Sequence, residues 1–360
     1  PKLNGTAFTN PLTFAVLPGS ASLANSTVSV STASLVAGSG TVNITVQLKD
    51  SNGNNLISTG GTVTFGNIPA GMGSIGSVTD NGNGTYSAIF TAGTTAGNVT
   101  ITPYLGGQAL SNTSAINLAV GSPSVSASVV TATASSLVAG SGATSTFTVR
   151  LKDANGNNLT SSGGTITFDN LPTGTGTIGT ITDNQDGTYT ATFTAGTTAG
   201  LVAITPKLNG TSFANPINLT VTPGAPSTSN STVSGTSSTM VAGSGATTTL
   251  TVTLKDANGN NLTASGGTVT FSVSGTGTGT LGNVTNNNDG TYTVTYTAGT
   301  TAGNVSILPR INGNAFASPL NLSIIPGAVS TSTSVVTASP TSLVAGTGAT
   351  SILTVQLKDA

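Results

Sequence analysis

The sequence predicts an all-β chain made of tandem β-sandwich domains, and two observations carry this prediction. The first is a repeat: Leu-Lys-Asp stands at 48–50, 151–153, 254–256 and 357–359, each time 103 residues further on. This period is too long for a solenoid repeat and fits one independently folding small domain. The second is that short alternating apolar runs lie between turn signals about 8–12 residues apart, which is typical of sandwiches.

The second copy shows the expected elements in order. Apolar Phe147, Val149 and Leu151 alternate with polar residues, which predicts a half-buried strand. Asn155-Gly156 then predicts a tight turn, because such pairs supply positive φ angles. About seven strands are expected per domain if the Gly-rich stretch 174–178 is counted as a strand. In the second copy they lie near 125–132, 147–151, 165–168, 174–178, 188–193, 201–208 and 216–221.

Composition supports a folded chain with a neutral surface. Charged residues make up 5% of the sequence, against about 25% in an ordinary soluble domain. Hydrophobic residues reach 36% and the net charge is −1, so the low hydrophobicity and high charge of disordered chains are both missing. There is no basic patch for nucleic acid and no apolar run long enough to span a membrane. Nor does a signal peptide open the sequence.

Domain boundaries are expected where short segments with Pro and Gly interrupt the strands, at 18–19, 121–123, 223–224 and 326–327. Because joints of two or three residues leave little freedom, we predict a semi-rigid rod. The predicted domains are a C-terminal domain fragment at 1–19, whole domains at 20–121, 122–224 and 225–327, and an N-terminal fragment at 328–360.

Three motifs recur in every complete repeat and carry a resemblance to a known family. Lys-Asp-Ala-Asn-Gly-Asn, with one Ser for Ala, stands at 49–54, 152–157 and 255–260. A polar turn ending in Gly-Thr-Tyr stands at 80–86, 183–189 and 286–292, and Thr-Ala-Gly-Thr-Thr-Ala-Gly at 91–97, 194–200 and 297–303. Together they resemble bacterial Ig-like domains of the invasin/intimin type. The resemblance implies tandem Ig-like sandwiches in extracellular stalks, adhesins or rods, and no shared catalytic residues.

The Tyr of the second motif is not predicted to be an Ig tyrosine corner, which lies at the start of the sixth strand, F. Two predicted strands, not one, follow Tyr86, Tyr189 and Tyr292. We therefore expect each of these residues to open the fifth strand, E.

Two groups of residues could be calcium ligands. Asp153 and Asn155 match the first ligands of an EF-hand loop, but positions 6 and 12, which need Gly and Glu, hold Asn158 and Gly164. The alternative is a turn in which the Asp side chain caps backbone N–H groups.

Asp183 and Asp186 form the second pair, and the third copy has Asn286 in place of Asp183. We therefore expect neither a metal nor a cofactor. An enzyme is not expected, because the sequence has no His or Cys and no base near a nucleophile.

The function expected is a structural stalk of a very large bacterial cell-surface or extracellular protein. The alternative is an adhesive module that binds a glycan or a surface protein through the polar loops 157–161 and 174–176. These loops lack aromatic anchors, and specific sites usually have them. We also expect the sequence to be one window of a longer array. Since few charges keep like chains apart, identical chains are expected to pack side by side.

Overall fold

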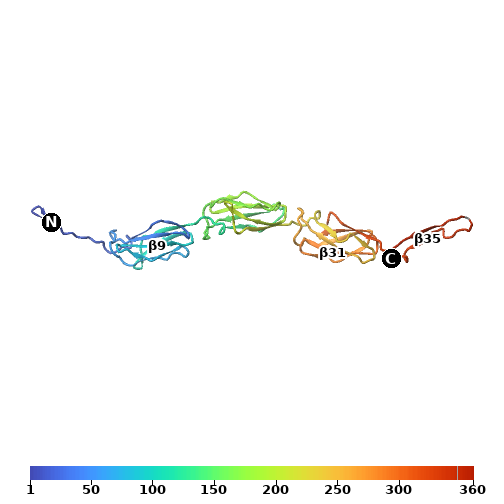
Figure 1. Ribbon diagram of the computed structural model, residues 1–360, viewed down its shortest axis with the longest axis horizontal. Helices are drawn as coiled ribbons and strands as arrows, with labels where there is room; N and C mark the ends of the chain where they lie inside the picture. Colours follow the sequence, from blue (N-terminus) through green and yellow to red (C-terminus); the bar gives the residue numbers. More distant parts are fainter. Residues whose placement is uncertain (347) are drawn as a thin grey trace.

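The computed structural model describes residues 1–346 and 348–360. They form an extended rod of three sandwich domains with a thin stranded segment at each end (Figure 1). Within these residues there is no helix, and so none that could cross a membrane. The all-β prediction is therefore confirmed.

The strands recur in the same order in each domain. The first domain holds β3 (Thr27–Val30), β4 (Ser34–Val36), β5 (Thr41–Gln47), β6 (Val63–Phe65), β7 (Gly73–Ile75), β8 (Thr79–Asp80), β9 (Thr85–Ala92), β10 (Gly97–Ile101), β11 (Pro103–Leu105), β12 (Gln108–Ala109) and β13 (Ser114–Ala119). The second holds β14 (Val129–Ala132), β15 (Ser136–Val138), β16 (Thr144–Arg150), β17 (Ile166–Phe168), β18 (Gly176–Ile178), β19 (Thr182–Asp183), β20 (Thr188–Ala195), β21 (Gly200–Ile204), β22 (Pro206–Leu208), β23 (Thr211–Ser212) and β24 (Ile217–Thr222).

The third domain and the two ends complete the chain. The third domain holds β25 (Thr232–Gly235), β26 (Thr239–Val241), β27 (Thr247–Thr253), β28 (Val269–Gly275), β29 (Gly279–Leu281), β30 (Thr285–Asn286), β31 (Thr291–Ala298), β32 (Gly303–Ile311), β33 (Asn314–Ala315) and β34 (Leu320–Ile325). The ends hold the pairs β1 (Lys2–Leu3) with β2 (Thr6–Ala7), and β35 (Val335–Ser339) with β36 (Ile352–Gln356).

Two layers of strands face each other in every domain. One has the strand order β14-β16-β20-β18 in the second domain, with the equivalent orders β3-β5-β9-β7 and β25-β27-β31-β29 in the others. The opposite layer of the second domain consists of two three-stranded sheets, β15-β24-β21 and β17-β22-β23, and β15 runs parallel to β24. The first domain is divided in the same way, whereas the third has the continuous order β26-β34-β32-β28. These orders place the strands as in an Ig-like sandwich, A-B-E-D against A′-G-F-C.

The third domain differs in its C strand. Here β28 has seven residues and pairs along its whole length with β32, whereas β6 and β17 have three residues each. In the first two copies Gly or Asp, then Asn and finally Pro follow the strand's Phe, while the third copy continues as Ser-Val-Ser. Pro69 and Pro172 stand at the position of Gly275, the last residue of β28, and Pro lacks the N–H that a sheet ladder needs, so β6 and β17 cannot extend as far as β28 does.

The core comes from the inward half of each alternating strand. In β16 the inward residues Ser145, Phe147 and Val149 are buried. Two apolar clusters fill the second domain, one around Phe147 and Phe193 and one around Leu151 and Tyr189. Burying one large apolar side chain contributes about 1.5–3 kcal/mol, and each domain carries its own set of such residues.

Tyr189 lies in the strand that the sequence predicted for it. It is the second residue of β20, which pairs with β16 and β18 and so takes the place of strand E. Its hydroxyl donates to the Gly164 carbonyl oxygen at 2.7 Å and accepts the Gly163 N–H at 3.1 Å. The tyrosine therefore ties strand E to the segment before strand C.

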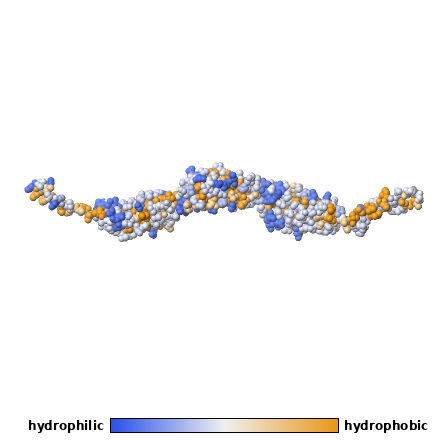
Figure 2. Space-filling view, viewed as in Figure 1, coloured by the Kyte–Doolittle hydropathy of each residue, from blue (hydrophilic) through white to orange (hydrophobic). Residues whose placement is uncertain are grey.

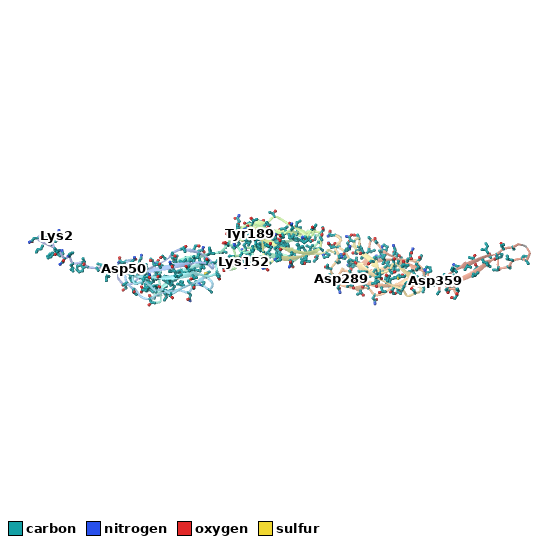
Figure 3. The ribbon with its side chains drawn as sticks, viewed as in Figure 1. Lys2, Asp50, Lys152, Tyr189, Asp289 and Asp359 are labelled. Atoms are coloured by element: carbon teal, nitrogen blue, oxygen red, sulfur yellow. The ribbon has the colours of Figure 1, made fainter. Side chains whose placement is uncertain are left out.

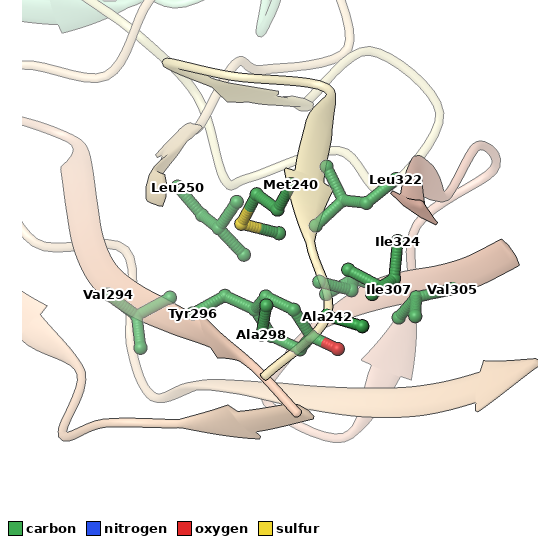
Figure 4. Close-up of a cluster of buried hydrophobic side chains, with 10 residues drawn as sticks. All are labelled: Met240, Ala242, Leu250, Val294, Tyr296, Ala298, Val305, Ile307, Leu322 and Ile324. Atoms are coloured by element: carbon green, nitrogen blue, oxygen red, sulfur yellow. The ribbon is translucent and has the colours of Figure 1, made fainter. Parts of the chain in front are cut away.

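One core position differs between domains. Tyr296 is fully buried where the other domains have Phe90 and Phe193 (Figure 4). Its hydroxyl has no hydrogen-bond partner among the residues that the structure describes.

We expect Tyr296→Phe to raise the free energy of unfolding of the third domain by about 1–2 kcal/mol, because the change removes an unpaired buried polar group. The matched control is Tyr292→Phe, which removes a hydroxyl that donates to the Gly267 carbonyl oxygen at 2.6 Å. That control is expected to lower the stability by about 1 kcal/mol. Urea denaturation measures both effects, and a Tyr296→Phe domain less stable than the native one would contradict this account.

The terminal segments expose residues that the complete domains bury. Leu353 and Val355 in β36 are 69% and 59% exposed, while their equivalents in β27, Leu250 and Val252, are 0% exposed. Phe14 near the other end is 82% exposed. Figure 2 shows the same contrast, with hydrophobic colour gathered on the two terminal segments and a mostly pale surface over the domains.

Candidate functional site at the interdomain joint

A buried aspartate organises the start of each domain. Asp153 is 1% exposed, and its Oδ1 accepts the backbone N–H groups of Asn155 and Asn157, both at 2.9 Å. Its Oδ2 accepts the N–H of Gly121 at 3.0 Å and the side-chain amide of Asn157 at 2.9 Å. The carboxylate thus fastens the turn after β16 to the linker that enters the domain. The predicted capping of N–H groups by this Asp is confirmed.

The same turn reaches across to the preceding domain. The Asn155 side-chain amide donates to the Ala37 carbonyl oxygen at 3.0 Å. Asn157 Oδ1 accepts the Ala96 N–H at 3.0 Å, and its Nδ2 donates to the Thr94 carbonyl oxygen at 2.8 Å. One turn of the second domain is therefore bound to two loops at the end of the first.

The next joint repeats the aspartate cap and the two Asn157 bonds 103 residues later, while the bond of Asn155 to Ala37 is found at the first joint. Asp256 Oδ2 accepts the Gly224 N–H at 2.9 Å, as Asp153 accepts that of Gly121. Asn260 Oδ1 accepts the Ala199 N–H at 2.9 Å, and its Nδ2 donates to the Thr197 carbonyl oxygen at 2.8 Å. In Figure 3 the labels of Asp50, Lys152 and Asp359 mark the corresponding turns along the rod. Successive domains are thus joined by a repeated set of contacts.

The receiving loop needs glycine at one position. Gly38 has a φ of +81°, and a Cβ added there would lie 2.6 Å from Asn155 Nδ2. At Gly140 a Cβ would lie 2.4 Å from Asn258 Nδ2. A side chain at either position would push the asparagine turn of the next domain away.

Hydrogen bonds keep the joint carboxylates ionised. The Asn54 side chain and then the Gly19 N–H lower the pKa of Asp50 to about 2. Burial raises the pKa of Asp153, but the hydrogen bonds from Asn157 and Gly121 outweigh it and hold the pKa below its usual value. A lowered pKa in the folded state contributes stability above the unfolded-state pKa of about 3.9, and this is lost as the pH falls through the folded-state pKa. The joints are therefore intact at neutral pH.

The second pair of candidate calcium ligands is also occupied by the chain itself. Asp183 accepts the Gln185 N–H at 2.8 Å and the Ser162 hydroxyl at 2.6 Å. Asp186 accepts the N–H of Thr188 at 2.9 Å and its hydroxyl. Nowhere in residues 1–346 and 348–360 do three His, Cys, Asp or Glu side chains gather as a metal site would require.

We expect the protein to be insensitive to calcium. The oxygens of Asp153 already accept four N–H groups, so a cation would have to displace them. Melting temperatures in EDTA and in millimolar calcium should agree, with magnesium as the control for ionic strength. A rise of more than ~5 °C specific to calcium would correspond to about 1 kcal/mol of linked binding and would contradict this expectation.

A groove of about 770 Å³ runs along the first joint. Ala96 and Asn117 line one side, and Pro123 and residues 157–163 line the other. None of its lining residues is ionisable, so the groove offers no general acid or base.

The two loops considered for binding a target do not meet. Residues 157–161 line the groove at the first joint. The loop 174–176 lies at the other end of the domain, where a Cβ on Gly174 would be 2.4 Å from Thr198 Oγ1. Thr198 stands between the two residues that bind Asn260 of the next domain. The loops therefore do not form a single site.

The sequence predicts the turn but not its partners in the preceding domain. Nothing in the residues around Asn155 predicts that its side chain contacts Ala37. The signal lies in the repeat itself, because the Thr-Ala-Gly-Thr-Thr-Ala-Gly segments recur with the 103-residue period of the Asp turns, and Ala-Gly recurs at 37–38 and 139–140, 102 residues apart. Two polar loop motifs that recur together once per domain indicate a contact between neighbouring domains.

These features define the class: a tandem array of Ig-like sandwich domains with a repeated, hydrogen-bonded joint. The chain belongs to the family described as "Invasin, domain 3", which matches residues 22–121, 124–224 and 227–327. The resemblance to invasin/intimin-type domains is therefore confirmed.

Solved structures similar to this chain come from bacterial adhesins and related proteins. The Escherichia coli adhesin FdeC is 31% identical, with 86% of this chain and 100% of that one covered and a TM-score of 0.51. Invasin, described as a bacterial integrin-binding protein, is 24% identical over 84% of this chain and 60% of its own, with a TM-score of 0.48. InvD of Yersinia pseudotuberculosis is 25% identical over 84% and 98%, with a TM-score of 0.45.

Proposed function

We propose that these domains form a stiff stalk segment of a large bacterial cell-surface adhesin. The observation that carries the proposal is the repeated joint, in which Asn157 and Asn260 make equivalent hydrogen bonds to the preceding domain. Such contacts fix the orientation of one domain on the next, so each domain adds a defined rise to the rod. We keep 20–121, 122–224 and 225–327, with the fragments 1–19 and 328–360, as the proposed domain limits.

Adhesion and an extracellular location are supported by the family and by the similarity to FdeC, which is named as an adhesin. A non-enzymatic role is supported by the groove at the joint, whose lining holds no ionisable side chain. We do not assign a glycan or protein target to the loops of these domains, because residue 157 is already used within the joint. A target would be bound by another part of the full-length protein.

The joint can be tested with a matched pair of variants. We expect Asn157→Ala combined with Asn260→Ala to make the rod bend, because each joint loses two hydrogen bonds to the preceding domain. Two such bonds contribute roughly 1–3 kcal/mol, enough to raise the bent population about tenfold. Small-angle scattering of the full chain should then give a smaller radius of gyration.

The control is Asn54→Ala. Asn54 is the equivalent residue of the first domain and makes the same bond to its own Asp50, at 3.0 Å, but within residues 1–346 and 348–360 it makes none to another domain. We expect this variant to scatter like the native chain. A native chain that is already compact, or a double variant that is as extended as the native chain, would refute the stalk proposal.

We also propose that identical chains pack side by side. The proposal is supported by the surface, which carries 17 charged residues in 360 and a net charge of −1. With so little repulsion, weak contacts repeated along two rods would add up through their number.

A further inference from the structure

One face of each domain is unusually uniform. The outward residues of the two central strands in the third domain, β27 and β31, are all threonines: Thr247, Thr249, Thr251, Thr253, Thr291, Thr293, Thr295 and Thr297. They stand opposite one another in register, with Thr249 paired to Thr295 and Thr251 to Thr293. We call this surface, with the equivalent surfaces of the other domains, the threonine face.

The equivalent strands of the other domains are nearly as neutral. In the second domain β16 and β20 place threonine at every outward position except Arg150. In the first domain β5 and β9 present Thr, Ser, Asn and Gln together with Ile89, which is 52% exposed. Among the outward positions of these six strands, Arg150 is the only charged residue.

The fold alone explains the threonines only in part. Thr favours strands, and cross-strand Thr pairs stabilise a sheet. The sheet does not require the absence of charge, since the outward positions of an exposed sheet can hold Lys or Glu at no cost in packing. In addition, the hydroxyls of Thr249, Thr251, Thr293 and Thr295 make no hydrogen bond within the part of the chain that the structure describes. These groups are available to a partner.

We propose that the threonine face is the surface through which a second copy of this chain packs, an inference that rests on the lateral packing proposed above. A hydroxyl both donates and accepts hydrogen bonds, so a face of threonines is complementary to itself across a two-fold axis. Burying this face removes almost no charged group from water, and so it avoids the high free-energy cost of burying charge.

The size of the face indicates that several domains act together. The strands β25, β27, β31 and β29 have 4, 7, 8 and 3 residues, which at about 4.8 Å by 3.3 Å for each residue cover roughly 350 Å². Two such faces bury roughly 700 Å² in total, well below the 1,200–2,000 Å² or so of a stable interface. A contact through one domain is therefore weak, and contacts through successive domains of two rods make the association stable.

The test compares two triple variants of the full chain. Ile89→Lys, Thr192→Lys and Thr295→Lys place a charge at one equivalent, exposed position of each threonine face. The control variant has Ala115→Lys, Asn218→Lys and Asn321→Lys, equivalent exposed positions on the outer surface of the opposite sheet. Both variants gain the same three charges, so a difference between them reports the face and not the net charge.

Sedimentation velocity over a range of concentrations gives the dissociation constant of each chain. We expect the native chain and the control variant to associate alike and the face variant at least about tenfold more weakly, which is about 1.4 kcal/mol. If both variants weaken self-association equally, the threonine face is not the contact surface, although lateral packing itself is still supported. A native chain that stays monomeric at millimolar concentration would overturn both the threonine face and lateral packing. The stalk proposal would be unaffected, because small-angle scattering tests it on single chains.

A second measurement covers the case in which the face variant fails to fold. The chain has no cysteine, so Thr295→Cys and Asn321→Cys each introduce a single thiol. A short bifunctional maleimide should cross-link two copies through position 295 and not through position 321, and the reverse result would overturn the proposal. A monomeric native chain that binds peptidoglycan through this face would also overturn it, because the occupant would then be a glycan.

Discussion

Replacement of Asp153 by alanine is expected to lower the free energy of unfolding of the second domain by about 3–5 kcal/mol. The carboxylate is 1% exposed and accepts four N–H groups, and each hydrogen bond to a charged group contributes about 1.5–3 kcal/mol. Asn155 is exposed and Asn157 and Gly121 are half-buried, so water replaces part of this loss. Urea denaturation measures the loss. Hydrogen exchange at the amides of Asn155 and Asn157 should show that it begins in this turn.

The control for this variant is Asp183→Ala, which also removes a carboxylate from a turn. Asp183 is exposed, so water can replace the hydrogen bonds from Gln185 and Ser162. We expect it to lower the stability by about 1 kcal/mol or less. If Asp183→Ala proved as destabilising as Asp153→Ala, the joint carboxylate would have no special role.

Phe193→Ala is expected to lower the stability of the second domain by about 3–5 kcal/mol, as for other large core residues. Phe193 is 0% exposed, and its ring stacks on that of Phe147 with the centroids 5.9 Å apart. A Cβ on Gly176 would lie 2.3 Å from the end of the ring, so the Gly-rich stretch of the sequence makes room for it. Deleting the ring leaves a cavity beneath β18. Thermal and urea denaturation both measure the effect.

The matched control is Leu201→Ala in the same domain. Leu201 is 64% exposed, so this variant should leave the stability within about 0.5 kcal/mol of the native value. Phe193→Leu keeps most of the apolar volume and should cost clearly less than Phe193→Ala. A domain that tolerates Phe193→Ala as well as it tolerates Phe193→Leu would contradict the packing described here.

The strands that depend on local alternation were predictable from the sequence. The period of two in residues 147–151 identified β16. Asn209-Gly210, between the predicted strands 201–208 and 216–221, forms a tight turn with φ of +49° and +84°, as Asn-Gly pairs favour. At Asn155-Gly156 only Gly156 has a positive φ, because Asp153 caps the turn instead. Local chemistry determined these elements, and so a single sequence was enough to find them.

Elements that depend on distant partners were not predictable. β15 has three residues and exists because it pairs in parallel with β24, more than 80 residues away. The joint was missed for the same reason, since the partner of Asn155 lies 118 residues earlier and in another domain. The predicted strand at 201–208 is divided at Thr205, just before Pro206, into β21 and β22. The equivalent Pro309 lies inside the unbroken β32, so the Pro alone does not decide the break.

The second domain carries both halves of the joint, and the first and third domains have the same sequence motifs at both ends. The second domain binds the first through Asn157 and receives Asn260 of the third at Thr197 and Ala199. Any copy can therefore follow any other, and unequal recombination between repeats of the gene can insert or delete a domain without creating a new interface. The length of such a stalk can thus evolve in whole steps of one domain, while the geometry between neighbouring domains stays the same.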